Sequence, residues 1–224
     1  MDALPYFLLH FAVVPVAAAV AVGLGRFRRL GTTQRYLLAL CLLALLMEVI
    51  SRVLAYYKQP NLFLAPVDAV IELVLLGLIY RRELRPAGIS RLIPWLLGGF
   101  VLGSALAYSP SADKPQFSPV QHFIECLLVL AFVGFYFHRE LNRRHNIGRL
   151  ECEPIFWIST GLLLYFLSNM LLFLASNYLL TLSKEMNVQV WAAHALLYMF
   201  LNVMYALALW LPEHRPAPPQ VTQS

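Results

Sequence analysis

Charge is scarce in this sequence of 224 residues. Asp, Glu, Lys and Arg make up 13% of it, about half their share in an average soluble domain, whereas hydrophobic residues make up 60%. The apolar residues fall in blocks of roughly 20, the length at which a helix crosses the hydrocarbon of a bilayer. This composition predicts an all-α, polytopic integral membrane protein. It excludes a separate soluble domain, because every segment between the blocks is short.

Cysteine is also rare, with three residues in the chain. Cys41 and Cys126 fall within apolar blocks and Cys152 lies in a basic stretch, so none is placed for an extracellular disulfide. The first apolar block has no basic residue before it, and arginines follow it from Arg26 onward. A cleaved signal peptide has the opposite order of charge, so this block is predicted to be a retained span.

Lysine and histidine are too few, and too far apart in the sequence, to form several known kinds of cofactor site. The three lysines, Lys58, Lys114 and Lys184, lie outside the apolar blocks, which excludes the Schiff base of a microbial rhodopsin. The HxxxH pattern of membrane zinc hydrolases is missing. Di-iron bundles need Glu-x-x-His on two helices, and this chain has one reversed pair, His122 and Glu125. We therefore predict no metal, no cofactor and no catalytic residue, and an intramembrane metalloenzyme is the least supported function.

Seven apolar segments are predicted to cross the membrane and to form one bundle over residues 1–211. They lie at about 5–24, 34–57, 62–80, 92–108, 118–137, 155–178 and 188–211. The remaining residues, 212–224, are polar and rich in proline, and are predicted to form a disordered cytoplasmic tail.

Basic residues alternate between the connections. The first, third and fifth are rich in arginine: Arg26, Arg28, Arg29 and Arg35; Arg81, Arg82, Arg85 and Arg91; Arg139, Arg143, Arg144 and Arg149. The other three have one lysine each. Positive charge marks the cytoplasmic side of a membrane protein, so the N-terminus is predicted outside and the C-terminus inside. The net charge of +5 then reflects these inner loops rather than nucleic-acid binding.

Two further patterns in the spans have ordinary structural explanations. Tyr and Trp gather near the predicted span ends, as in the interfacial belt of membrane proteins. They are Tyr56, Tyr57, Tyr80, Trp95, Tyr108, Tyr136, Trp157, Tyr178, Trp191 and Trp210. Gly99 and Gly103 have GxxxG spacing, which we interpret as close helix packing within the bundle. A homodimer formed through this glycine face is the alternative.

A short sequence repeat links the third and fifth spans. "PVDAVIE" aligns without gaps with "PVQHFIE", which pairs Pro66 with Pro119 and Glu72 with Glu125. Both segments run from outside to inside and end in an REL triplet. This predicts a repeated two-helix unit, with a chance match between apolar sequences as the rival explanation.

Polar residues recur within the predicted spans, mostly in their outer halves. The candidate ligand- or ion-binding residues are Glu48, Asp68, Glu72, His122, Glu125, Asn169, His194 and Asn202. Asp68 and Glu72 are spaced i,i+4, and His122 and Glu125 i,i+3, so each pair shares one helix face. Ionisable groups in spans face the bundle interior or a cavity rather than lipid. We therefore expect a polar pocket that opens to the outside.

The acids of this pocket cannot all stay ionised at close range. We expect one or more to be protonated, or paired with His122, His194 or Arg52. The competing explanation is a set of interhelical hydrogen bonds that only fix the bundle, worth about 0.6 kcal/mol each. That explanation is the favoured one for a single amide such as Asn169, and a functional pocket is favoured for the whole set.

The last two predicted spans have the most distinctive sequence patterns. "EPIFWISTGLLLYFLSNMLLFLASNYLL" and "WAAHALLYMFLNVMYALALW" together resemble a group of small, largely uncharacterised seven-span membrane proteins of Bacteroidota-type bacteria. Similar segments accompany sensor histidine kinases. The resemblance covers mainly residues 153–210, implies no site residues, and implies a sensory or signalling component of the bacterial inner membrane.

These observations favour a non-enzymatic protein that senses a small molecule or ion in an outward-facing polar pocket. Its partners are expected to be the lipid bilayer and a histidine kinase or other signalling protein at the Arg-rich inner loops. The alternative is a proton- or cation-coupled transporter of small solutes, in which the same acids bind the coupling ion.

Overall fold

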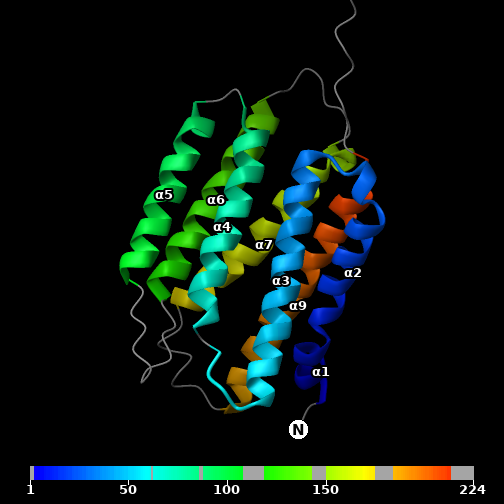
Figure 1. The fold of residues 1–224 in the computed structure, drawn as a ribbon, viewed down its shortest axis with the longest axis vertical. Coiled ribbons are helices and arrows are strands. Elements are labelled where there is room, and N and C mark those ends of the chain that lie inside the picture. Colours follow the sequence, from blue (N-terminus) through cyan, green and yellow to red (C-terminus); the bar gives the residue numbers. More distant parts are fainter. Residues whose placement is uncertain are drawn as a thin grey trace, which may run out of the picture.

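The computed structural model describes residues 3–61, 63–85, 88–107, 119–142, 150–174 and 184–212. Within these ranges it is all-helical and contains no strand (Figure 1). The α-helices are α1 Ala3–Phe11, α2 Val13–Gly25, α3 Thr32–Tyr56, α4 Leu64–Glu83, α5 Ile89–Ala107, α6 Pro119–Asn142, α7 Pro154–Leu174 and α9 Lys184–Trp210. Two short 3-10 helices, η1 Phe27–Arg29 and η2 Leu150–Cys152, precede α3 and α7.

In the described part of the chain, six helical segments are long and apolar enough to cross a membrane, which is the architecture of a multi-pass helical membrane protein. They are Phe7–Gly25, Thr32–Tyr56, Ile89–Ala107, Pro119–Asn142, Pro154–Leu172 and Val188–Trp210. The helix missing from this set is α4, which matches the predicted third span in position. Its charged residues, Asp68, Glu72, Arg81, Arg82 and Glu83, make it the most polar of the long helices.

The helices pack as a ring, with α5 on its outside. Each of α2, α3, α4, α6, α7 and α9 contacts the next in this order, and α9 closes the ring against α2. α1 packs against α9, and α5 packs against α4 at the edge of the bundle (Figure 1). α4 is therefore covered by α3, α5 and α6, which is how a helix with this many charges is accommodated.

The outer surface of the bundle is apolar and the interior is mixed. Leu102, Leu106 and Leu171 are 66%, 88% and 60% exposed. Apolar side chains exposed in such numbers indicate contact with lipid. The core is formed by large buried residues such as Leu73, Ile79, Phe132, Ile158 and Leu162, and polar side chains including Gln34, Glu125, Ser159 and Asn202 are buried among them.

The first predicted span, 5–24, is two helices rather than one. α1 ends at Phe11 and α2 begins at Val13, with a turn at Ala12 between them. Pro15 explains the break, because it has no N–H to donate to the Phe11 carbonyl and its ring crowds that carbonyl.

The glycines at close helix contacts are not those that the sequence singled out. A Cβ at Gly99 or Gly103 would meet no atom within 4 Å, so these residues do not mediate close packing within the bundle, and that interpretation is wrong. Close approach occurs instead at Gly77 and Gly161. A Cβ on Gly77 would lie 2.6 Å from Leu97 Cδ1 of α5, and a Cβ on Gly161 would lie 3.0 Å from Met204 Cβ of α9.

Two members of the predicted aromatic belt lie in the core. Tyr80 and Tyr136 are 0% and 1% exposed, and the Tyr80 hydroxyl forms a 2.8 Å hydrogen bond with Ser159 Oγ. By contrast, Tyr56, Trp95 and Trp210 are exposed, and their place in an interfacial belt stays a prediction. Tyr108 and Tyr178 lie outside the described residues.

Side-chain hydrogen bonds tie four helices together at the end of the bundle where α9 finishes. Gln34 Nε2 of α3 donates to the carbonyls of Ala208 and Leu211, over 2.7 and 2.8 Å. Thr33 donates to the Glu83 carboxylate, and Arg139 of α6 donates to the Glu83 carbonyl. The described Arg-rich connections lie at this same end (Figure 1). Lys58 follows the last residue of α3, which begins at this end and finishes at the other. Lys114, Arg143, Arg144, Arg149 and residues 213–224 fall outside the described residues.

Candidate functional site

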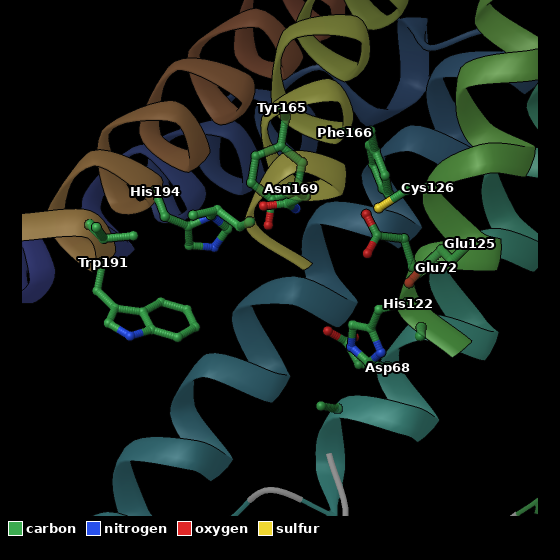
Figure 2. A pocket seen from close by; sticks show the side chains of 14 residues that line it. Asp68, Glu72, His122, Glu125, Cys126, Tyr165, Phe166, Asn169, Trp191 and His194 are labelled. Carbon is green, nitrogen blue, oxygen red and sulfur yellow. The ribbon is translucent and has the colours of Figure 1, made fainter. Parts of the chain in front are cut away.

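A cavity of about 260 Å³ lies between α4, α6, α7 and α9 (Figure 2). Its lining unites most of the polar residues singled out in the sequence. The lining residues are Ala65, Asp68, Ala69, Glu72, His122, Glu125, Cys126, Tyr165, Phe166, Asn169, Leu172, Val190, Trp191 and His194. Six of the eight candidates are among them: Asp68, Glu72, His122, Glu125, Asn169 and His194.

Helical spacing explains how the acids reach one cavity. On α4, Asp68 and Glu72 are one turn apart, and on α6 His122 and Glu125 have the same relation. Glu72 lies about 12 Å along α4 from its first residue, and Glu125 about 9 Å along α6. Because both helices begin at the same end of the bundle, the two carboxyls reach similar depth (Figure 1).

The repeated motif determines which side of each helix faces inward. Ile71 and Ile124, which precede the two glutamates, are 36% and 42% exposed, whereas Glu72 and Glu125 line the cavity. α4 and α6 are neighbours, and Gln121 Nε2 donates to the Pro66 carbonyl over 2.9 Å. The aligned residues therefore occupy matching positions on two adjacent helices.

The two walls of the cavity differ in chemistry. α4 and α6 contribute the acids and His122, and α7 and α9 contribute aromatic rings, an amide and His194 on the facing side (Figure 2). The ring of His194 lies 5.5 Å from that of Tyr165 and 5.7 Å from that of Trp191, centroid to centroid. The Tyr165 ring lies 5.8 Å from that of Tyr198. An acidic wall thus faces an aromatic one.

Glu125 is the most deeply buried acid of the site. Its side chain is 4% exposed, and among the described residues no hydrogen-bond partner reaches its Oε1. The carboxyls of Glu72 and Asp68 line the same cavity. His194 Nδ1, on the opposite wall, is likewise buried without a partner in the described part of the chain. Buried polar groups are nearly always hydrogen-bonded, so these atoms mark a place where a ligand or proton can be held.

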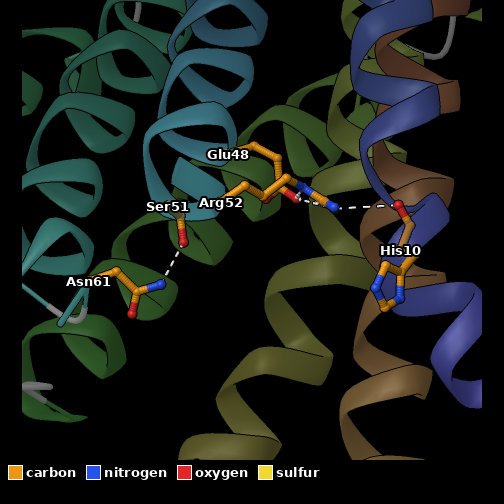
Figure 3. A network of polar contacts seen from close by, with 5 residues as sticks. All are labelled: His10, Glu48, Ser51, Arg52 and Asn61. Atoms are coloured by element: carbon orange, nitrogen blue, oxygen red, sulfur yellow. Dashed lines mark hydrogen bonds and ion pairs between the residues drawn. The ribbon is translucent and has the colours of Figure 1, made fainter. Parts of the chain in front are cut away.

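Glu48 and Arg52 form a separate pair outside this cavity. Arg52 Nη2 lies 2.6 Å from Glu48 Oε1, and Arg52 also donates to the His10 carbonyl of α1 over 3.4 Å (Figure 3). Arg52 therefore pairs with Glu48 rather than with the acids of α4 and α6. Glu48 lines an adjoining cavity of about 420 Å³, which shares Asp68, Tyr165, Trp191 and His194 with the first.

Asn202 does not belong to the lining of either cavity. Its side chain is 1% exposed, and its Nδ2 donates to the Tyr198 carbonyl one turn earlier in α9, over 2.9 Å. The side-chain amide of Asn202 is thus hydrogen-bonded within its own helix. Asn169, for which bundle fixation was favoured, is the amide that lines the cavity.

Sequence reasoning missed the aromatic wall. Trp191 was assigned to the belt, and Tyr165 and Phe166 were not proposed as site residues. A signal was present, because Trp191, His194 and Tyr198 are spaced i, i+3 and i+7, and Tyr165 and Asn169 i, i+4. Cys126 follows Glu125 and also lines the cavity.

Within the described ranges, no group of three or more His, Cys, Asp and Glu residues is arranged to hold a metal ion. No protein-family model, curated protein or solved structure gives a significant match to this chain.

Proposed function

We propose that the chain is a seven-span protein of the bacterial inner membrane, with its N-terminus outside and its C-terminus inside. The span that this proposal adds to the six apolar segments is α4, which is the third along the chain. Its acids Asp68 and Glu72 line the cavity, and its arginines, Arg81 and Arg82, lie at the Arg-rich end. The alternation of basic connections supports the orientation, because Arg-rich loops remain in the cytoplasm.

In this orientation the cavity opens to the outside. Trp191, which lines it near the beginning of α9, is 49% exposed. The proposed function is the binding of a small molecule or ion from outside, for sensing. The observation that carries this proposal is the unpartnered carboxyl oxygen of Glu125, buried beside Glu72 in a cavity of about 260 Å³.

The output of the sensor is proposed to leave through the Arg-rich inner end. There α3, α4, α6 and α9 are joined through Gln34, Glu83 and Arg139. A shift of α4 against α6 at the cavity would change these contacts, because both helices extend from the cavity to the Arg-rich end. The proposed partner is a histidine kinase or another signalling protein that contacts this basic surface.

The experiment is complementation of a deletion strain, with the transcript profile as the readout. Glu72→Gln and Glu125→Gln should reach the membrane in normal amounts and fail to restore the wild-type profile. Ile71→Leu and Ile124→Leu, conservative changes of the exposed residues that precede the two glutamates, are the matched controls and should restore it. Restoration by both cavity variants would mean that the acids are structural and would overturn the proposal.

A proton- or cation-coupled transporter is the second candidate. The observation in its favour is the pair of carboxylates at equivalent points of two similar helices, which resembles the repeats of many transporters. Proteoliposomes with an acid outer solution distinguish the two. Solute uptake driven by the proton gradient, and lost in Glu125→Gln, would replace sensing by transport.

A further inference from the structure

The lining of the cavity is acidic and has no strong cation to balance it. Asp68, Glu72 and Glu125 all contribute to it, and within the described residues no lysine or arginine does. Arg52, which lies on α3 in the same half of the bundle, is already paired with Glu48, with Nη2 2.6 Å from Oε1. A carboxylate in a membrane interior is costly unless it is neutralised by a proton or a counter-ion. The site therefore favours a positively charged ligand over a neutral or negative one.

The opposite wall identifies what kind of cation fits. Tyr165, Phe166 and Trp191 present aromatic surface to the same space. Aromatic faces attract ammonium groups and pack against the apolar parts of a ligand. A small inorganic ion would leave this wall without a function, and Ca²⁺ would need six or more oxygen ligands. Among the described residues, no three or more His, Cys, Asp and Glu side chains are arranged to hold a metal ion.

The space available limits the size of the ligand. The cavity measures about 260 Å³, and the adjoining one that shares Asp68, Tyr165, Trp191 and His194 adds a second chamber. Sites for drug-sized ligands start at about 300 Å³, so this cavity suits a compact molecule.

We propose that the cavity binds a small organic cation, a protonated amine with an apolar group. Its ammonium lies between Glu72 and Glu125, and its apolar group lies against Tyr165 and Trp191. This inference rests on the proposed function and names the ligand class of the same site. The unpartnered oxygen of Glu125 becomes the acceptor of an ammonium hydrogen.

The test is thermal unfolding of the full chain in lipid nanodiscs with three probes of similar shape. They are benzylammonium, neutral benzyl alcohol and anionic phenylacetate. A further series of primary amines, beginning with methylammonium, varies the size of the apolar group. At least one amine should raise the unfolding midpoint in a saturable manner, and the alcohol and the carboxylate should not. The comparison of charges uses the wild-type chain, so it does not depend on any variant that fails to fold.

Variants then locate the binding. Glu125→Gln and Glu72→Gln should weaken the apparent Kd for the amine by at least about tenfold, since truncating one partner of a buried charge pair commonly costs more than the 1.4 kcal/mol that tenfold represents. Glu151→Gln, a change of an exposed acid in η2 that does not line the cavity, should leave the apparent Kd unchanged. Equal shifts by benzyl alcohol or phenylacetate, no shift by any amine, or an unaltered Kd in both cavity variants would overturn the inference. If the amines fail but complementation still depends on Glu72 and Glu125, the ligand class is wrong and the proposed function stands.

Discussion

Glu125 shows how one residue acquires a different meaning in the structure. In the sequence it is a charge misplaced in an apolar segment. In the structure it is 4% exposed, lines a cavity with Glu72, and has one oxygen without a partner in the described part of the chain. The repeat and the helical spacing predicted the pairing of the two glutamates, because both are local properties of the sequence.

The two asparagines show what residue-level reasoning could not separate. Both are buried polar residues in apolar spans, and the sequence gives no rule for where an amide will find a partner. Asn202 bonds the Tyr198 carbonyl of its own helix, whereas Asn169 faces the acids. The difference depends on which helix lies opposite, which is a property of the assembled bundle.

This difference gives a prediction for the complementation assay. Asn202→Leu should restore the wild-type transcript profile, because the lost hydrogen bond is worth about 0.6 kcal/mol in a membrane and the residue lines no cavity. Asn169→Leu, the matched change, should fail, because it replaces a polar group of the site by an apolar one. Failure of Asn202→Leu at normal protein level would contradict this assignment.

At the scale of the helices, the sequence located the spans but not their contacts. The predicted segments agree with α3, α4, α5, α6, α7 and α9 to within a few residues at most ends. The first span was predicted as continuous because apolar periodicity does not register the clash at Pro15. Tyr80 and Tyr136 were assigned to the interface by position along the span, although burial depends on which face of the helix meets its neighbours.

The contact between α7 and α9 is a test of packing at this scale. Gly161→Val should lower the free energy of unfolding by about 1–3 kcal/mol, because the added side chain would overpack against Leu201 and Met204, each 3.0 Å from an ideal Cβ. The measurement is denaturant unfolding in detergent. Gly134→Val in α6 is the control, since a Cβ there meets no atom within 4 Å. Equal destabilisation by both substitutions would mean that propensity, rather than packing, sets the cost.

At the scale of the whole molecule, the arrangement follows from covering α4. The sequence predicted seven segments, and six of them are apolar enough to be recognised as spans on composition alone. α4 is the exception, and α3, α5 and α6 shield it. The position of α5 outside the ring could not be read from the sequence, because five other helical segments in the described residues are also apolar enough to be recognised as spans.

The orientation in the membrane is tested with fusions. A fluorescent protein that folds only in the cytoplasm should fluoresce when fused after Ser224. Alkaline phosphatase, which is active only outside, should be active when fused after Lys58 and inactive when fused after Arg85. Activity after Arg85 would reverse the orientation or remove α4 from the spans.

The central claim is that Glu72 and Glu125 face one water-accessible cavity while their neighbours face lipid. It is tested most directly by replacing residues 71, 72, 124 and 125 one at a time with cysteine, in a chain whose native cysteines are changed to alanine. A membrane-impermeant thiol reagent is applied to intact cells from outside. A thiol reacts as its thiolate, so a lipid-facing position should react slowly. The account predicts labelling of Glu72→Cys and Glu125→Cys and little labelling of Ile71→Cys and Ile124→Cys. Equal labelling within each neighbouring pair, or labelling only after the inner face is exposed, would contradict it.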